Sequence, residues 1–271
     1  ATPIPRTLAL LMYGDLDVSV LDQLPPGRQV VDTFLVGESY RARINAFIRK
    51  QVAEGHQCFV VCPAVEENGE LGIKAATAWA DTLQQTVFPD LRIALLHGQM
   101  RGEEKEAAMA AFARREADVL VATTVIEVGV DVPNATLMVI EDADRFGLSQ
   151  LHQLRGRVGR GSSKSYCILT THNRNEETLR RLKALCKTTD GFRIAEEDLR
   201  LRGPGDFFGS RQSGLPAFRM ADLSFDLGLL KQAQEASAQW IDSSGTAHTP
   251  EADALRQRVS QLFQRSEGTM N

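Results

Sequence analysis

The stretch VLVATTVIEVGVDVPNATLMVI, residues 119–140, contains two short apolar runs separated by a mixed turn segment. The runs Val119–Ala122 and Leu137–Ile140 are apolar throughout, without the polar alternation of a strand that has one solvated face. Such runs are typical of strands buried on both faces of a parallel sheet. This stretch therefore predicts the centre of an α/β fold.

The same pattern repeats on either side of this stretch. Further apolar runs predict strands at Val30–Val36, Cys58–Cys62, Arg92–Leu96 and Ser165–Leu169. Helical patterns lie between them at Tyr40–Ala53, Ile73–Gln85 and Glu103–Arg114. The alternation predicts a parallel sheet with helices on both faces. Because ligands bind beyond the carboxyl ends of such strands, we expect the loops after Leu96, Ala122 and Ile140 to gather on one edge.

The pattern changes after about Thr171. Leucines at helical spacing, followed by the turn TTDG and a second amphipathic segment, predict a helical hairpin. The apolar positions of its two helices are Leu179, Leu182 and Leu185, then Phe192, Ala195 and Leu199. A loop rich in glycine, RGPGDFFGSRQSG, comes next, and helices are predicted at Asp226–Trp240 and Glu251–Gln264.

The first residues, ATPIPRTLALLMYGD, contain an apolar segment that leads into Pro25, Pro26 and Gly27. We interpret this segment as the tail of a preceding domain with its linker, and the chain as a piece of a longer protein. The expected organisation is a remnant and linker at residues 1–27, an α/β domain at 28–171 and a helical region at 172–271.

The charge is unevenly distributed. The chain carries a net charge of −4, yet Arg145–Arg219 contains 15 Lys and Arg against 7 Asp and Glu, a local charge of +8. A basic zone on an acidic body suggests that one face binds an anion. Chance clustering on a solvated surface is the alternative.

Composition excludes several classes of protein. No run of about 18 apolar residues exists, so no membrane-spanning helix is expected. Cys58, Cys62 and Cys167 lie in apolar surroundings and resemble buried small hydrophobes. The spacing of the four cysteines does not favour a metal site, and it fits a reducing, cytoplasmic compartment.

The segment QLHQLRGRVGRG, residues 150–161, gathers three arginines and three glycines with no acid nearby. In a helical turn, Arg157 and Arg160 would project to one side, while Gly156 and Gly159 would let a bulky partner approach. Two guanidinium groups suit a triphosphate, and we expect the cluster of three arginines to be open to solvent. A surface cluster with ordinary salt bridges is the alternative.

The loop VATTVIEVGVDVP can be interpreted in two ways. Thr123 and Thr124 end a buried strand, where hydroxyl and backbone N–H groups could hold a phosphate. Gly129 fits a tight turn, and Asp131 could accept a hydrogen bond from a ribose hydroxyl. A plain strand-to-helix connection, with Asp131 as a helix cap, is the simpler interpretation.

Taken together, TPIPRTL, HGQM, TTVIEVGVDVP and QLHQLRGRVGRG resemble, in this order, the later motifs of superfamily 2 helicases. These motifs belong to the second of two RecA-like lobes, between which ATP binds. The resemblance implies that Arg157 and Arg160 are catalytic arginine fingers. It places Gln153, Gly129 and Asp131 at the nucleotide cleft, and His97, Gly98, Thr123 and Thr124 on the DNA track.

The stretch DGFRIAEEDLRLRGPGDFFGSRQSG resembles the translocation motif shared by RecG helicases and transcription–repair coupling factors. It implies that Arg181, Arg202 and Gln212 couple ATP hydrolysis to movement. The following FRMADLSFDLGLL favours the RecG family, whose members remodel stalled replication forks and migrate Holliday junctions. A coupling factor that pushes RNA polymerase and a non-catalytic docking module remain as alternatives.

The sequence lacks the phosphate loop G-x-x-x-x-G-K-[ST] and an acidic DExH-like box. Glu141, Asp142 and Asp144 form an acidic cluster, but nothing pairs them for a magnesium or nuclease site. We therefore expect ATP and Mg²⁺ to be held mainly by another lobe, with no cofactor bound tightly by this chain and no ATP hydrolysis by it alone.

The resemblance also implies partners. These are branched double-stranded DNA (forks and Holliday junctions), the first RecA-like lobe and an N-terminal wedge domain of the same protein, and a single-strand-binding protein. A membrane is not among them, and a bacterial, nucleoid-associated cytoplasmic location is expected.

Overall fold

The computed structural model describes residues 29–63, 70–123, 131–202, 232–233, 235–240 and 250–267. The chain divides into two compact units, and among the described residues the boundary lies between Ala195 and Glu196. The predicted division at residues 27 and 171 stays a prediction. In the predicted helix Asp226–Trp240, residues 232–233 and 235–240 are described and helical.

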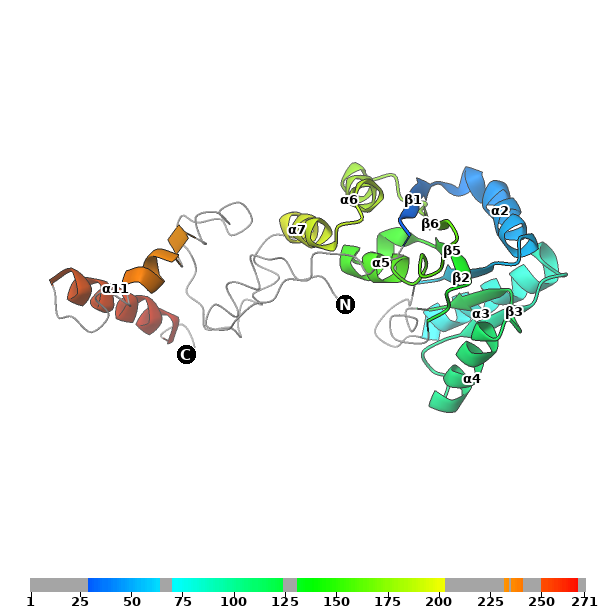
Figure 1. Ribbon diagram of the computed structural model, residues 1–271, viewed down its shortest axis with the longest axis horizontal. Coiled ribbons are helices and arrows are strands. Elements are labelled where there is room, and N and C mark those ends of the chain that lie inside the picture. The colour runs from blue at the N-terminus through cyan, green and yellow to red at the C-terminus, as the bar shows by residue number, and fades with distance from the viewer. Residues whose placement is uncertain are drawn as a thin grey trace. The chain divides into compact units, whose positions relative to one another are not determined.

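A single six-stranded sheet organises the first unit (Figure 1). The strands are β1 (Val31–Val36), β2 (Gln57–Val61), β3 (Ile93–Leu96), β4 (Val119–Ala122), β5 (Ala135–Ile140) and β6 (Ser165–Thr170). They run in the order β1-β6-β5-β2-β4-β3, and each neighbouring pair is parallel. The predicted parallel α/β sheet is confirmed, with each predicted strand displaced by two residues at most.

Helices lie between successive strands, and further helices follow β6. They are η1 (Glu38–Tyr40), α2 (Arg41–Ala53), α3 (Glu70–Thr82), the π-helical turn η2 (Leu83–Val87), α4 (Gly102–Ala113), η4 (Ala143–Arg145), α5 (Leu148–Arg155), α6 (Glu176–Lys187), α7 (Gly191–Arg202) and α11 (Pro250–Glu267). Helices α6 and α7 are the predicted hairpin. Helix α5 was not predicted, because the glycine- and arginine-rich residues that follow it favour a loop.

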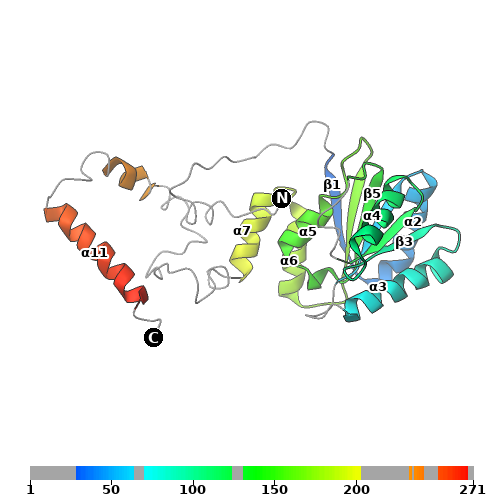
Figure 2. The same ribbon diagram turned by 90° about the horizontal axis from the view of Figure 1, so that it is seen from below.

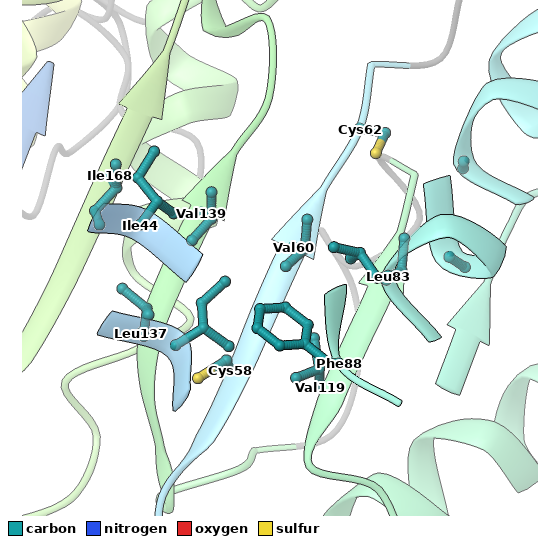
Figure 3. Packing of buried hydrophobic residues seen from close by; sticks show 14 residues of the cluster. Ile44, Cys58, Val60, Cys62, Leu83, Phe88, Val119, Leu137, Val139 and Ile168 are labelled. Atoms are coloured by element: carbon teal, nitrogen blue, oxygen red, sulfur yellow. The ribbon is translucent and has the colours of Figure 1, made fainter. Parts of the chain in front are cut away.

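Both faces of the sheet are covered. On one face, Ile44 of α2 and Leu83 of η2 pack with Val60 and its neighbours, as Figure 3 shows. On the other face, the ring of Phe59 lies 5.0 Å from that of Phe112 of α4, measured between centroids. Figure 2 shows α2 and α3 on one side of the sheet and α5 and α6 on the other. The continuous apolar runs of β2, β4 and β5 follow from this double coverage.

The three cysteines expected in the core are buried. Burial raises the pKa of the Cys62 thiol to about 12, because the thiolate would lose its hydration. These side chains therefore act as small apolar groups in the packing. Among the described residues, no helix is long and apolar enough to cross a membrane.

Parallel strands give the sheet two chemically different edges. Helix α5 starts beyond the carboxyl end of β5 and returns to the amino end of β6. The loop at residues 156–164 therefore lies at the amino edge, whereas the ends of β3 and β4 lie at the carboxyl edge. The loops after Leu96 and Ile140 begin at the carboxyl edge, as expected. The expectation was wrong for the arginine-rich residues 156–161, because α5 carries the chain back across the sheet.

The core packing predicts that alanine substitutions at two phenylalanines lower the free energy of unfolding by different amounts. Phe59 is 2% exposed and contacts α4, whereas Phe34 on edge strand β1 is 49% exposed. Phe59→Ala should lower the free energy of unfolding by about 3–5 kcal/mol, because it leaves a cavity. Phe34→Ala should change it by less than about 1 kcal/mol. Urea denaturation followed by circular dichroism measures both, and equal losses would contradict the described packing.

Candidate functional site

Arg160 forms an ion pair at the amino edge of the sheet. Its Nη1 lies 3.3 Å from Oδ1 of Asp131, and its Nε donates a hydrogen bond to the carbonyl of Gly156 at 3.1 Å. Asp131 precedes β5 and Arg160 precedes β6, so the pairing of these neighbouring strands brings the two residues together. The expectation that no acid lies near this arginine was wrong, because the partner comes from a distant part of the sequence.

The loop after α5 is not a helical turn. The helix ends at Arg155, the amide of Arg157 donates to Leu154 at 2.9 Å, and Gly159 then adopts a φ of 76°. A Cβ atom at Gly159 would lie 2.8 Å from Cγ2 of Val31. The prediction of a shared helical turn for Arg157 and Arg160 was therefore wrong. Gly159 allows the chain itself, rather than a bulky partner, to come close.

Arg155 is buried, with 4% of the residue exposed. Its Nη1 donates to the carbonyls of Leu185 at 2.7 Å and Thr188 at 2.9 Å, which end helix α6. Its Nη2 lies 3.0 Å from Nδ1 of His152. The expectation that all three arginines are open to solvent was wrong. Position 155 continues the apolar face of Leu148 and Leu151 at helical spacing, and this signal could have revealed its burial.

A second arginine holds the middle of α6. Nη2 of Arg181 donates to the carbonyl of Asp144 at 2.6 Å. Asp144 lies in η4, between β5 and α5, at the carboxyl edge. Arg155 and Arg181 therefore connect α6 with the β5–α5 segment near both edges of the sheet.

The residues predicted for the DNA track lie at the carboxyl ends of β3 and β4. Thr123 is buried, and its amide donates to the carbonyl of Leu96 at 3.1 Å. The carbonyl of Gly98 accepts a hydrogen bond from Nζ of Lys105 at 2.7 Å. Nδ1 of His97 is buried and has no hydrogen-bond partner within the described part of the chain. The structure thus brings His97, Gly98 and Thr123 together on one edge.

Two members of the acidic cluster after β5, Glu141 and Asp144, accept hydrogen bonds from neighbouring side chains. Arg41 of α2 binds both carboxylate oxygens of Glu141, at 2.6 and 2.8 Å, and this contact raises the pKa of its guanidinium. The hydroxyl of Thr170 donates to Glu141 at 2.7 Å, and that of Thr171 donates to Asp144 at 2.6 Å. In the described ranges, no group of three or more His, Cys, Asp or Glu residues could hold a metal ion.

The remaining predicted site residues are described only in part. Gln153 lies on α5 and is partly buried, and Arg157 is partly buried in the loop after that helix. Arg202 is the last residue of α7, and its side chain lies outside the described residues. Thr124, Gly129 and Gln212 also lie outside the described residues.

Two family models match the chain. The helicase conserved C-terminal domain matches residues 40–162. The model described as ATP-dependent DNA helicase RecG, domain 3, C-terminal, matches residues 188–267. The first match covers the sheet from η1 to the Arg160 loop, and the second covers the second hairpin helix and the C-terminal region through α11.

Known relatives agree with both models. The chain is 51% identical over 265 residues to the ATP-dependent DNA helicase RecG of Synechocystis sp., covering 97% of this chain and 32% of that protein. It is 51% identical over 245 residues to RecG of Thermotoga maritima, covering 90% and 31%. The chain thus spans about a third of the length of these curated relatives.

The fold gives the same result. A solved structure of RecG bound to a three-way DNA junction superimposes with a TM-score of 0.68 at 48% identity. The match covers 85% of this chain and 30% of that one. Sequence, family models and fold agree: the chain is similar to the C-terminal helicase lobe and the adjoining C-terminal region of the ATP-dependent DNA helicases RecG.

Proposed function

We propose that this chain is the second motor lobe of an ATP-driven translocase that moves on double-stranded DNA. The whole protein would remodel stalled replication forks and migrate Holliday junctions in recombination and repair. One observation carries the proposal. The segment that presents Arg157 and Arg160 is bonded through the adjacent Arg155 to the carboxyl end of α6 in the hairpin. A nucleotide contact and a mechanical element therefore share one structural unit.

The amino edge is the proposed nucleotide side. Arg157 and Arg160 are arginine fingers in this proposal, and Gln153 and Asp131 line the cleft with them. Guanidinium groups fit a triphosphate, because each fork can bind two phosphate oxygens. Arg160 has 32% of its side chain exposed and is held by Asp131 and Gly156, so it is oriented while remaining accessible. An arginine at a transferring phosphate is worth about 10³–10⁵ in rate.

Magnesium belongs to the same proposal. Mg²⁺ usually binds phosphate oxygens together with one or two carboxylates and several waters. In the whole protein we expect ATP and Mg²⁺ to be held mainly by the first lobe. The residues of this chain would contribute positive charge opposite the phosphates.

The carboxyl edge is the proposed DNA side. His97 and Gly98 lie there with the buried Thr123, at an edge where exposed backbone N–H groups and hydroxyls can contact phosphates without reading sequence. Such contacts suit a protein that must advance over any sequence. Branched double-stranded DNA is the proposed substrate, and the junction-bound RecG relative supports it. The first lobe, a wedge domain and a single-strand-binding protein are the other proposed partners, in the bacterial cytoplasm near the nucleoid.

Helix α6 would connect the two edges. Arg155 fixes the carboxyl end of α6 beside the arginine-finger loop. Arg181 fixes the helix to η4, which lies at the carboxyl edge of the sheet. A stiff helix held near both edges can transmit a displacement from the nucleotide side to the DNA side. Arg202 and Gln212 are proposed to continue this coupling beyond the hairpin.

The alternatives differ in what they require of these residues. A transcription–repair coupling factor would use the same motor against RNA polymerase, but the family model that matches the second hairpin helix and the region after it is that of RecG. A docking module would need neither the Arg160–Asp131 pair nor a rigid connection to α6. The proposed motor role accounts for both.

The arginine-finger role predicts a loss of ATP hydrolysis without a loss of fork binding. In the full-length protein, Arg160→Ala should reduce DNA-stimulated ATP hydrolysis at least about 10³-fold, because the transition-state charge loses its partner. Fork binding should change little, since Arg160 lies at the opposite edge from the proposed DNA track. Phosphate release and fork-binding titrations measure the two properties. Parallel loss of both would contradict the assignment.

The coupling role of α6 predicts a loss of fork unwinding without a loss of ATP hydrolysis. Arg181→Ala removes the bond to Asp144, so ATP hydrolysis should persist while fork unwinding falls at least several-fold. Arg180→Ala is the matched control, because Arg180 lies next to it on α6 and is exposed. ATPase and unwinding assays on one preparation separate the effects. If Arg181→Ala unwinds forks as the wild type does, α6 does not couple through this bond.

The division of the site between two lobes predicts complementation. The 271-residue chain by itself should show no DNA-stimulated ATP hydrolysis, because its sequence contains no phosphate loop. Adding the separately produced first lobe should restore hydrolysis, and Arg160→Ala in the added chain should abolish the restored activity. A chain that hydrolyses ATP without the first lobe would contradict the shared site.

A further inference from the structure

A cavity of about 420 Å³ lies at the carboxyl ends of β1 and β6, away from the residues assigned so far. Three segments line it: the end of β1 with η1, the loop after β6, and one face of α6. The lining residues are Leu35, Val36, Gly37, Glu38, Ser39, Thr171, His172, Asn173, Arg174, Leu179 and Lys183. We name it the β1–β6 cavity.

Two cations that line this cavity are available to a ligand. Neither Arg174 nor Lys183 makes an ion pair or hydrogen bond with another residue in the described part of the chain. Both residues are exposed, and they approach the cavity from different elements, the β6–α6 loop and α6 itself. Elsewhere on this edge an arginine forms an ion pair with a carboxylate, as Arg41 does with Glu141. Available cations from two different walls favour an anionic occupant.

The carboxylate of Glu38 offsets only part of this charge. Arg41 contacts both of its oxygens, at 3.2 and 3.1 Å, and this hydrogen bonding lowers the pKa of Glu38. His172 lies 3.6 Å from the same carboxylate. Arg41 also binds Glu141, so the two carboxylates share one cation and Glu38 offsets part of the charge of Arg174 and Lys183. With two cations against one carboxylate, the lining keeps a net positive charge.

The lining fits a backbone phosphate better than a free nucleotide. Its apolar part is aliphatic, from Leu35, Val36 and Leu179, and the lining contains no Phe, Tyr or Trp on which a base could stack. The polar groups include donors that suit phosphate oxygens, such as the Ser39 hydroxyl and the Arg174 guanidinium. The aliphatic part can contact a deoxyribose.

The position of the cavity relates it to the proposed DNA track. All strands are parallel, so the ends of β1 and β6 share an edge with the ends of β3 and β4. Five strand spacings of about 4.8 Å separate β1 from β3, a span of about 24 Å. This equals about seven base pairs of B-form DNA at about 3.4 Å each. One duplex could contact both ends of the edge.

We propose that the β1–β6 cavity binds one backbone phosphate of duplex DNA through Arg174 and Lys183, as a second anchor on the carboxyl edge. This inference rests on the proposed function of the chain as a DNA translocase. Lys183 and Arg181 belong to the same helix, so one of the two cations of the anchor is part of the hairpin. The DNA contact at this end of the edge is therefore attached to the element that we propose transmits the nucleotide state.

The test uses the full-length protein with the double variant Arg174→Ala/Lys183→Ala. Binding to a three-way junction and to linear duplex is titrated over a range of salt concentrations. At about 0.1 M salt, the Kd for both DNAs should rise about 5- to 10-fold, and the slope of log K against log salt should fall by about 1. ATP turnover at saturating DNA should match the wild type, with a higher DNA concentration needed for half-stimulation.

Two control variants isolate the cavity. Arg180→Ala/Lys187→Ala removes the same charge from exposed positions of α6 outside the cavity and should leave the slope unchanged. Arg174→Lys/Lys183→Arg keeps the charge and should restore most of the affinity. Thermal unfolding of each variant reports on folding. An unchanged slope in Arg174→Ala/Lys183→Ala, or an equal loss in the Arg180 and Lys187 control, would overturn the proposal.

Two further readouts identify other causes of failure. The KM for ATP without DNA should be unaffected. An increase in that KM with normal DNA binding would mean that the cavity takes a free nucleotide, which overturns the proposal. A wild-type protein whose ATP hydrolysis is not stimulated by duplex DNA would instead refute the proposed function. If duplex DNA stimulates ATP hydrolysis by the wild type normally, but Arg174→Ala/Lys183→Ala binds DNA as the wild type does, only the cavity proposal is refuted.

Discussion

The guanidinium of Arg155 must find hydrogen-bond acceptors inside the protein, because almost none of the residue reaches solvent. A buried charge without such partners is strongly unfavourable. The carbonyls of Leu185 and Thr188 supply them, and these are groups that the end of α6 leaves without helical donors. One residue thereby satisfies its own charge and the end of a helix, and this fixes the hairpin against the arginine-rich segment.

The parallel sheet sets the second constraint. Each crossover returns the chain to the opposite edge, so residues that follow a strand and residues that precede the next strand are kept apart. Asp131 and Arg160 precede strands and meet at the amino edge, whereas Thr123 and Thr171 follow strands and lie at the carboxyl edge. A two-edged lobe can present different chemistry on each side. Helix α6, with Arg155 near one edge and Arg181 near the other, is the element that contacts both.

Much of the fold could be predicted, because strands buried on both faces produce apolar runs that the sequence shows directly. The runs at residues 119–122 and 137–140 locate the centre of the sheet to within two residues. Helix α5 could not be located in the same way, since its two turns end in glycine and arginine. The Arg160–Asp131 pair was also missed, because 29 positions separate its members and only the pairing of β5 with β6 unites them.

The sequence by itself determined the α/β class, the hairpin and the residue types of the candidate site. These follow from local periodicity and from resemblance in short motifs, which need no knowledge of long-range contacts. Only the tertiary structure decided which arginine is buried, which is paired and which remains available. Arg155, Arg160 and Arg174 carry the same side chain, but their environments come from residues distant in the chain. Burial and partner choice are properties of packing, and the physical role of each arginine therefore depends on the folded arrangement.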